Sequence, residues 1–338
     1  MEPSIQGLPA LYRYRFRFEA EQGIRMPPMP GSAWRGLLGH GLRKAACVTR
    51  TPTCEGCLLR ESCIHNRIFE SDFEGEARYR KRPHPFVLEV EMGGRWREIA
   101  AGEAFELGIT LFASAREALP YLIHAFERGG REGFGRGRGR FTLRSVDALH
   151  GGAKPVRRPL WHRDGGKLEA AGEPVPLPPL LPPGSLTIEL STPLRIKERG
   201  RLVRPEEFTA GHFLRALSRR AGDVGRFYGT AGSFTPPQEP AGVVLSDGRL
   251  AWHDWRRFSS RQKGYMNMGG IVGSFRLSGD RLAAWWPLIW YGQWLHLGKG
   301  TSMGMGRYRA GQRTTASEGG KPRPKGDGHC NEVMVSES

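Results

Sequence analysis

The stretch LYRYRFRFE, residues 11–19, alternates aromatic and basic side chains with a period of two. In an extended chain, all the aromatic residues fall on one face and all the arginines fall on the other. The aromatic face comprises Tyr12, Tyr14, Phe16 and Phe18, and the basic face comprises Arg13, Arg15 and Arg17. This pattern predicts a half-buried β-strand with a basic outer face.

The segments that follow this strand complete one predicted βαββαβ unit. Apolar residues recur with helical spacing over 32–47 and again after Ser114, which is a suitable N-cap for a second helix. Between these helices, the ranges 86–92 and 105–111 alternate as strands do, and the range 140–149 closes the unit as a further strand. This order of elements is typical of a ferredoxin-like fold.

The second half of the chain repeats this order approximately, which predicts an α+β protein with tandem ferredoxin-like (RRM-like) domains. We expect residues 1–150 to form the first domain and residues 185–311 to form the second. The Pro- and Gly-rich range 151–184 is expected to be a linker, and the small, polar residues of 312–338 are expected to be a disordered tail. Within the second domain, the range 243–255 is expected to form a hairpin or a bent pair of strands.

The charge of the chain narrows the class of partner. Among 338 residues, 51 Lys and Arg stand against 34 Asp and Glu, which gives a formal net charge of +17. This excess favours nucleic acid over a membrane surface, and an inert basic surface is the alternative. Because the N-terminus lacks the order of a signal peptide and no apolar run is long enough to span a membrane, we expect a cytoplasmic protein.

Two basic glycine-rich loops occupy equivalent places in the two halves, EGFGRGRGRF at 132–141 and GKGTSMGMGRY at 298–308. Each follows a predicted helix and precedes a predicted strand, which reverses the order of Walker and dinucleotide-binding loops. We therefore interpret them as loops whose backbone N–H groups approach the phosphates of an extended nucleic acid, with basic tight turns as the alternative. The residues expected to contact phosphate are Arg136, Arg138, Arg140, Gly298, Lys299, Gly300, Gly304, Gly306 and Arg307.

Four of the five cysteines lie close together in the first domain. Cys47, Cys54, Cys57 and Cys63 have the spacing C-x6-C-x2-C-x5-C within the insertion 47–66. Four soft ligands at this spacing can close one tetrahedral site, so structural Zn²⁺ is the leading interpretation. An iron–sulfur cluster and reduced, unligated thiols are the alternatives.

Five segments, taken in order, resemble the CRISPR-associated endoribonucleases of the RAMP superfamily that process precursor CRISPR RNA. GSAWRGLLGHGLRKAACV and GFGRGRGRFTLRSV are similar to the N-terminal domain of that family. TPLRIKERGRLVRPEEF, WRRFSSRQKGYMNMGGIVGSF and LHLGKGTSMGMGRYR are similar to its C-terminal domain. The resemblance implies tandem ferredoxin-like domains that bind CRISPR repeat RNA. It also implies cleavage at the 3′ side of the repeat without a catalytic metal, giving a 2′,3′-cyclic phosphate and mature crRNA.

Such a reaction needs an acid/base and cations that stabilise the developing charge on phosphorus. His40 is the first candidate, because it lies on the polar side of its predicted helix and because the resemblance places a catalytic His on this helix. Lys44 and Tyr265 are the other catalytic candidates, with packing or base stacking as the alternative for Tyr265. The RNA-binding residues expected outside the glycine-rich loops are Arg43, Arg195, Lys197, Arg201, Arg261 and Lys263.

Two other classes of function stay open. A non-cleaving crRNA-binding subunit of a CRISPR effector complex would use the same fold and loops, with other effector subunits as its partners. The predicted exposure of His40 favours the nuclease over that subunit. An iron–sulfur redox protein would account for the cysteines but not for the net charge of +17 or the paired loops.

Overall fold

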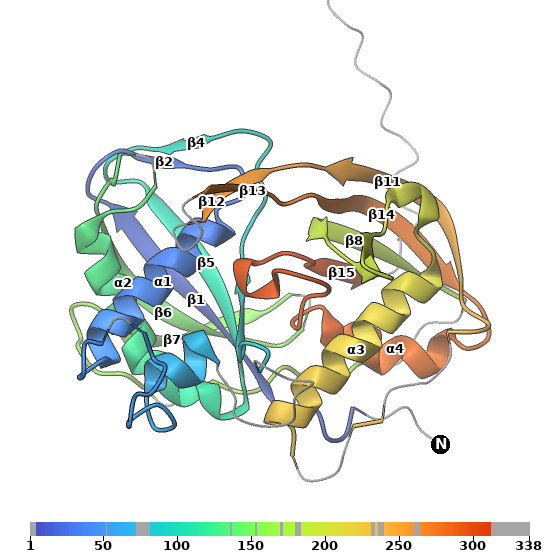
Figure 1. Cartoon of the computed structure of the whole chain (residues 1–338), viewed down its shortest axis with the longest axis horizontal. Coiled ribbons are helices and arrows are strands. Elements are labelled where there is room, and N and C mark those ends of the chain that lie inside the picture. Colours follow the sequence, from blue (N-terminus) through green and yellow to red (C-terminus); the bar gives the residue numbers. More distant parts are fainter. Residues whose placement is uncertain are drawn as a thin grey trace, which may run out of the picture.

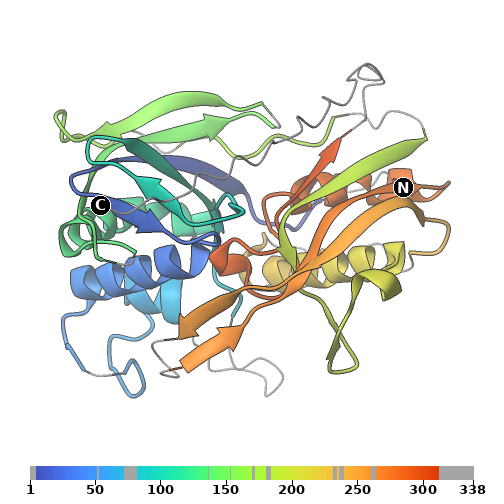
Figure 2. The ribbon, with the colours of Figure 1, turned by 90° about the horizontal axis from the view of Figure 1, so that it is seen from above.

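The computed structural model contains two α/β units that lie side by side, each with an antiparallel sheet (Figures 1 and 2). It describes residues 5–51, 53–71, 82–135, 137–152, 154–169, 172–179, 184–230, 234–235, 240–259 and 264–311. Within that part of the chain, no helix is long and apolar enough to cross a membrane. The expected tail, 312–338, lies outside the described residues.

The first unit has a five-stranded sheet in the order β3-β5-β1-β6-β7, with α1 and α2 on one face (Figure 2). Its main elements are β1 (Leu11–Ala20), β2 (Ile24–Met26), α1 (Gly31–Ala46), β3 (Phe86–Glu89), β4 (Arg97–Ile99), β5 (Ala104–Phe112), α2 (Leu119–Glu132), β6 (Phe141–His150) and β7 (Val156–His162). Two short helical turns, η1 (Asn66–Glu70) and η2 (Ala113–Ala118), precede β3 and α2. The order β3-β5-β1-β6 is the ferredoxin-like arrangement that the sequence pattern predicts.

The second unit repeats this arrangement with a four-stranded sheet in the order β11-β14-β8-β15. Its sheet and helices are β8 (Ser185–Leu194), α3 (Ala210–Tyr228), β11 (Val244–His253), β14 (Gly270–Ser278), α4 (Leu282–Gly292) and β15 (Tyr308–Gly311). Two small hairpins and two helical turns extend it, namely β9 (Lys197–Glu198) with β10 (Arg201–Leu202), β12 (Arg256–Ser259) with β13 (Gly264–Asn267), η3 (Pro205–Glu207) and η4 (Thr301–Met303). The fold is therefore a tandem of two ferredoxin-like sheets.

The aromatic face of β1 forms the centre of the first core. Phe16 and Phe18 are fully buried, and Phe18 stacks on Trp34 of α1 with ring centroids 5.1 Å apart. Phe126 of α2 packs against the same ring of Phe18 at 5.7 Å. Each aromatic side chain buried here contributes about 1.5–3 kcal/mol of hydrophobic free energy, which fixes both helices on the sheet.

The basic face of β1 is not open along its whole length, which corrects the sequence prediction for Arg13. The Arg13 side chain is only 7 % exposed, because the second unit covers this end of the strand. Its guanidinium donates to both carboxylate oxygens of Glu89, and Nη2 of Arg307 in the second unit lies 3.7 Å from the same carboxylate. A buried ionic cluster therefore joins the two units.

The expected linker over 151–184 contains a strand, which is a second correction. Val156–His162 forms β7 and pairs with β6 at the edge of the first sheet. Most of β7 is exposed, so its sequence carries no alternation of apolar and polar residues. Pro159 is tolerated within it, because an edge strand leaves one row of N–H groups unpaired.

The range 243–255, where we expected a hairpin or a bent pair of strands, contains one strand, β11, whose register against β14 shifts between Ser246 and Arg249. The hairpin lies immediately after it, as β12 and β13. In Figure 2 this hairpin projects from the second unit toward α1. There Nη1 of Arg257 donates to Oγ of Ser32 at 3.5 Å, so the hairpin touches the first unit.

Candidate active site and nucleic-acid interface

His40 lies on the exposed side of α1, and 61 % of its side chain is accessible to solvent. Its Nε2 atom is 3.4 Å from Oε2 of Glu132, the last residue of α2. Nζ of Lys44, one helical turn after His40, lies 2.6 Å from Oε1 of the same carboxylate. His40 and Lys44 therefore share one acidic partner.

Glycines on both helices allow α2 to come this close to α1. A Cβ atom at Gly41 would lie 2.4 Å from the carbonyl oxygen of Ala125, which is closer than any real contact. In the opposite direction, Leu37 of α1 packs onto Gly129, where a Cβ would lie 2.4 Å from its side chain. This close packing brings Glu132 to the exposed edge of α1.

Glu132 is a site residue that the sequence pattern did not reveal. The hydrogen bond from Lys44, opposed by a smaller effect of burial, lowers the pKa of Glu132, so the group is ionised at neutral pH. Glu132 is 88 residues from Lys44, and their contact depends on helix packing that no local pattern records. Its only local signal is its position directly before a glycine-rich loop.

Tyr265 lies on β13 and is 71 % exposed, so it is not a core residue. The guanidinium carbon of Arg256 lies 5.1 Å from the centroid of its ring. An aromatic ring on an exposed strand next to a cation can stack on a base. Arg261 and Lys263, which the sequence places in the same hairpin, lie outside the described residues.

The glycine-rich loop of the first unit packs on the turn that leads into β2. A Cβ at Gly139 would lie 2.4 Å from the carbonyl oxygen of Gly23. The side chains of Arg138 and Arg140 are exposed beside this contact. Arg136 lies outside the described residues, so two of the three predicted arginines can be placed, and both reach the surface.

The glycine-rich loop of the second unit is buried between the units, which corrects the prediction for part of it. A Cβ at Gly304 would lie 2.8 Å from the carbonyl oxygen of Leu88 in the first unit. The carbonyl group of Met303 approaches Gly31 at the start of α1 so closely that a Cβ there would collide with it. Gly304 and Gly306 are both buried, Gly304 against the first unit and Gly306 against Leu297 of its own unit. Neither glycine faces a phosphate, contrary to the prediction.

Arg307 is an interface residue and not the surface cation that we expected. Its side chain is 15 % exposed, and its Nη1 donates to the carbonyl oxygen of Val90 at 3.3 Å. Lys299 in the same loop is exposed, and Gly298 and Gly300 beside it are half-buried. Among the residues that we predicted in this loop, Lys299 is therefore the cation that faces solvent.

Arg43 and Arg195 also make contacts within the protein. Arg43 donates to the carbonyl oxygen of Thr51 in the cysteine-rich segment. Nη1 of Arg195 donates to the carbonyl oxygen of Gly269 at 3.2 Å and so supports the start of β14. Both side chains therefore have structural partners in addition to the RNA contacts predicted for them.

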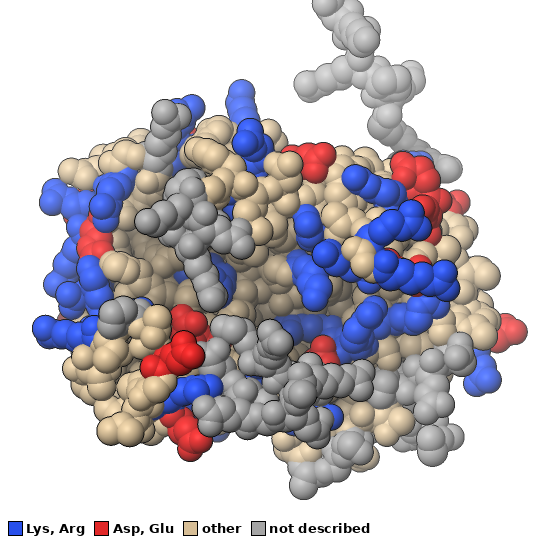
Figure 3. All heavy atoms as spheres, viewed as in Figure 1, with Lys and Arg blue, Asp and Glu red and all other residues tan. Residues whose placement is uncertain are grey.

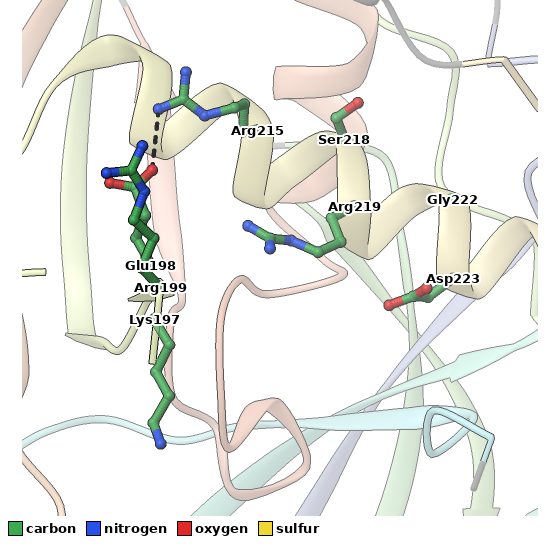
Figure 4. Close-up of a pocket in the computed structure, with 8 residues that line it drawn as sticks. All are labelled: Lys197, Glu198, Arg199, Arg215, Ser218, Arg219, Gly222 and Asp223. Atoms are coloured by element: carbon green, nitrogen blue, oxygen red, sulfur yellow. Dashed lines mark ion pairs between the residues drawn. The ribbon is translucent and has the colours of Figure 1, made fainter. Parts of the chain in front are cut away.

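A basic pocket of about 580 Å³ lies between α3 and the β9–β10 hairpin (Figure 4). Arg215 and Arg219, one turn apart on α3, point toward the hairpin that carries Lys197. Arg215 is paired with Glu198 at 3.5 Å. Figure 3 shows Lys and Arg side chains gathered over α3 and the segments next to it. The residues that line the pocket are Lys197, Glu198, Arg199, Arg215, Ser218, Arg219, Gly222 and Asp223.

Of the cations in this pocket, the sequence interpretation included Lys197 and missed the arginines at 199, 215 and 219. The two on α3 follow the helical period, because residues four apart share one face. That signal was present in the sequence, but it does not say whether the face meets solvent or a neighbouring element. The structure places it at the surface.

The cysteine-rich segment lies beside α1. Its four thiols are partly buried, and Sγ of Cys54 lies 3.7 Å from Nδ1 of His65. The sulfur atoms of Cys47 and Cys57 each lie 3.8 Å from Oγ1 of Thr49. In these positions, no three Cys, His, Asp or Glu side chains of the described residues are grouped to hold a metal ion. The Zn²⁺ site therefore stays a prediction.

Together these features define a class of protein. It has two ferredoxin-like units in tandem, a basic surface and an exposed His on its first helix. A family model described as the CRISPR-associated endoribonuclease Cas6 matches residues 188–308. A second family model, described as an N-terminal domain, matches residues 8–173. The sequence of residues 188–308 is therefore similar to Cas6, and the fold of the chain is similar to that of solved Cas6 structures.

Solved structures agree with this fold. A chain of a partial Cas6-RT-Cas1–Cas2 complex has a TM-score of 0.53 and 12 % identity, over 91 % of this chain and 47 % of that one. A Cas6 product complex has a TM-score of 0.50 and 15 % identity, over 89 % of this chain and 98 % of that one. Cas6 of Thermus thermophilus has a TM-score of 0.50 and 14 % identity, over 89 % of this chain and 98 % of that one.

The chain spans about half of the first of these structures, at 47 %, and nearly all of the other two. At identities of 12–15 %, the likeness shows the fold. No curated protein matches the chain.

Proposed function

We propose that this protein is an endoribonuclease that binds CRISPR repeat RNA in the cytoplasm and cleaves the precursor at the 3′ side of the repeat. The observation that carries the proposal is the contact of His40 and Lys44 with one carboxylate, that of Glu132, on the exposed edge of α1 in a Cas6-like fold. An imidazole can serve as the acid/base, and an ammonium group beside it can stabilise the developing charge, when RNA is cleaved by its own 2′-OH.

In the proposed reaction, His40 takes the proton from the ribose 2′-OH. The 2′-oxygen attacks phosphorus and the bond from phosphorus to the 5′-oxygen breaks, which leaves a 2′,3′-cyclic phosphate and a 5′-hydroxyl. The ammonium group of Lys44 stabilises the negative charge that develops on the phosphoryl oxygens. The leaving 5′-oxygen takes its proton from Lys44 or from Tyr265.

Glu132 acts as a positioning residue in this proposal. Its carboxylate lies within contact distance of both His40 and Lys44, so it can hold the two side chains in a fixed relation to one another. Exposed side chains as long as Lys lose conformational freedom only when a partner holds them, and Glu132 is that partner. A carboxylate beside an imidazole also stabilises the imidazolium that forms when His40 takes a proton.

The repeat RNA is bound by cations on both units. Arg138 and Arg140 lie at the surface of the first unit, and Lys197 and Arg219 lie in the pocket beside α3. Phosphate contacts of this kind position the RNA and give a salt-dependent affinity. One similar structure is a partial Cas6-RT-Cas1–Cas2 complex, so other CRISPR proteins are proposed partners as well.

The test is incubation of the full chain with an end-labelled repeat RNA in EDTA, followed by analysis of the product ends. We expect a cyclic phosphate and a 5′-hydroxyl from the wild type, and no cleavage but retained RNA binding from His40→Ala. His124→Ala is the matched control, because His124 is an exposed residue of α2. Stable binding without cleavage by the wild type would instead indicate a crRNA-binding subunit, and cleavage that requires Mg²⁺ would contradict the mechanism.

A further inference from the structure

We propose that Cys47, Cys54, Cys57 and Cys63 bind one structural Zn²⁺ ion that fastens the cysteine-rich segment to α1. The spacing of the four thiols supplies a complete tetrahedral ligand set within 17 residues, counted from the first cysteine to the last. This proposal does not depend on RNA cleavage, because it concerns the metal content of the protein and the stability of one segment.

The backbone between Cys54 and Cys57 forms a tight turn. The N–H group of Cys57 donates to the carbonyl oxygen of Cys54 at 3.4 Å, and Gly56 between them has a φ of +69°, a conformation that favours glycine. The N–H group of Arg60 then donates to the carbonyl oxygen of Cys57 at 3.1 Å. A turn of this kind lets two cysteines separated by two residues bind the same ion.

The other two thiols are tied to helical segments on either side of this turn. Cys47 ends α1, where its N–H group donates to the carbonyl oxygen of Arg43 at 2.9 Å. Its sulfur atom shares Thr49 as a neighbour with the sulfur of Cys57, each at 3.8 Å. Cys63 receives a hydrogen bond at its carbonyl oxygen from the N–H of Arg67, at 2.9 Å. Binding must draw the thiols together, so we expect the loop to tighten when the ion enters.

A continuous set of contacts connects this segment to the helix that carries the candidate catalytic His. His65 is 2 % exposed, with Nδ1 3.7 Å from Sγ of Cys54 and its ring stacked on Phe69 at 5.7 Å between centroids. The Phe69 ring in turn lies directly on Gly39, where a Cβ would come within 2.1 Å of it. Gly39 precedes His40, so a zinc ion would hold the packing surface beside the candidate site.

The test is the metal content of the full chain, purified without a metal-affinity tag from medium that contains both zinc and iron. We expect about one zinc ion per chain in the wild type. The Cys54→Ser/Cys57→Ser variant should contain at least about five-fold less zinc, since a site with two ligands left does not retain the ion. Cys330→Ser, whose residue lies outside the described part of the chain, should keep its zinc. Iron with absorbance near about 400 nm, or reactive thiols without any metal, overturns the proposal.

A measurement on the wild type covers the case in which the variant fails to fold. Titration with a mercurial reagent that displaces thiolate-bound zinc, read by a zinc-sensitive dye, should release about one equivalent. Hydrogen exchange at Phe69 and along α1 should become faster when the ion is released, because the segment is then no longer fastened. Release of zinc with unchanged exchange at these positions would overturn the structural role that we propose.

Discussion

The carboxylate of Glu89 accepts hydrogen bonds from Nε and Nη2 of Arg13, at 3.0 and 3.1 Å, between the two ferredoxin-like units. The side chains of Arg13 and Glu89 are only 7 % and 2 % exposed, so both charges are almost completely removed from water. Oγ1 of Thr110 donates to the same carboxylate at 2.8 Å, and Arg307 approaches it from the second unit. One acid thus joins β1, β3 and β5 to the segment that enters β15.

We expect Glu89→Gln to lower the free energy of unfolding by about 3–5 kcal/mol, because it leaves the Arg13 charge buried without a counter-ion. Urea unfolding at neutral pH measures this change. Glu91→Gln is the matched control, since Glu91 lies two residues further along the chain and is exposed, and it should change stability by less than about 0.5 kcal/mol. An equal effect of both substitutions would show that the buried Arg13–Glu89 pair contributes no more to stability than an exposed glutamate does.

The same cluster predicts a loss of stability in acid. Burial alone would raise the pKa of Glu89, but the charge and hydrogen bonds of Arg13 outweigh burial, so the pKa lies well below its ordinary value of 4.5. A carboxyl whose pKa is lowered by folding stabilises the folded state above the unfolded pKa. That contribution is lost as the pH falls from about 4.5 toward the folded pKa. We therefore expect the difference between wild type and Glu89→Gln in urea unfolding to shrink steadily below about pH 4.5.

His296 adds a second contribution with the same direction. Burial, followed by the charge of Arg307, lowers the pKa of His296 from 6.5 to about 3, so its ring is neutral in the folded state. Between pH 6.5 and about 3, the unfolded chain carries a proton on this ring that the folded protein does not carry. The free energy of unfolding therefore falls as the pH falls through this range. The free energy of unfolding of the wild type should thus begin to fall at a higher pH than the protonation of Glu89 alone predicts. A flat profile between pH 6.5 and 4.5 would contradict this expectation.

The parts of the fold that the sequence predicted are those with one buried face. β1 alternates because Phe16 and Phe18 point into a core, and α1 shows a helical stripe because Trp34 and Leu38 do the same. β7 is exposed on most of its length, so burial imposes no pattern on its residues. The interface was missed for a different reason, since burial of Arg13 depends on a second unit that local periodicity does not describe.

The same distinction between local pattern and tertiary packing applies to the candidate site. Exposure of His40 follows from the helical period alone, and the structure agrees with it. The contact between His40 and Glu132 depends on close packing of α1 on α2, which a single-sequence pattern does not encode. The glycines at 304 and 306 show the reverse difficulty. Their spacing is typical of a phosphate-binding loop, yet the lack of side chains at these positions serves close packing, of Gly304 on the first unit and of Gly306 on Leu297.

Glu132→Gln tests the positioning role proposed for this carboxylate. We expect cleavage to slow about ten-fold while RNA binding is unchanged, because general acid–base catalysis is worth about 10²–10⁴-fold and misplacement forfeits part of it. Glu127→Gln is the control on the same helix, where Glu127 pairs with Arg163 at 3.1 Å. A loss of RNA binding together with cleavage would indicate a structural role only.

The basic pocket beside α3 predicts how RNA binding depends on salt. Each cation that contacts a phosphate releases counter-ions on binding, so its removal should weaken binding to all sequences and lower the salt slope by about 1. Lys197→Ala and Arg219→Ala should therefore each reduce the slope between about 50 and 200 mM salt, and together by about 2. Fluorescence anisotropy with a labelled repeat measures both affinity and slope.

Arg157→Ala is the matched control for this series. Arg157 is 49 % exposed and pairs with Glu106 on the first sheet, with Nη1 2.6 Å from the carboxylate. Arg157→Ala removes one positive charge, as Arg219→Ala does. A difference between the two variants in salt slope therefore reflects where the charge lies and not the net charge of the protein. If Arg157→Ala lowers the salt slope as much as Arg219→Ala does, binding reflects the overall charge of +17 and the pocket beside α3 is not the site of phosphate contact.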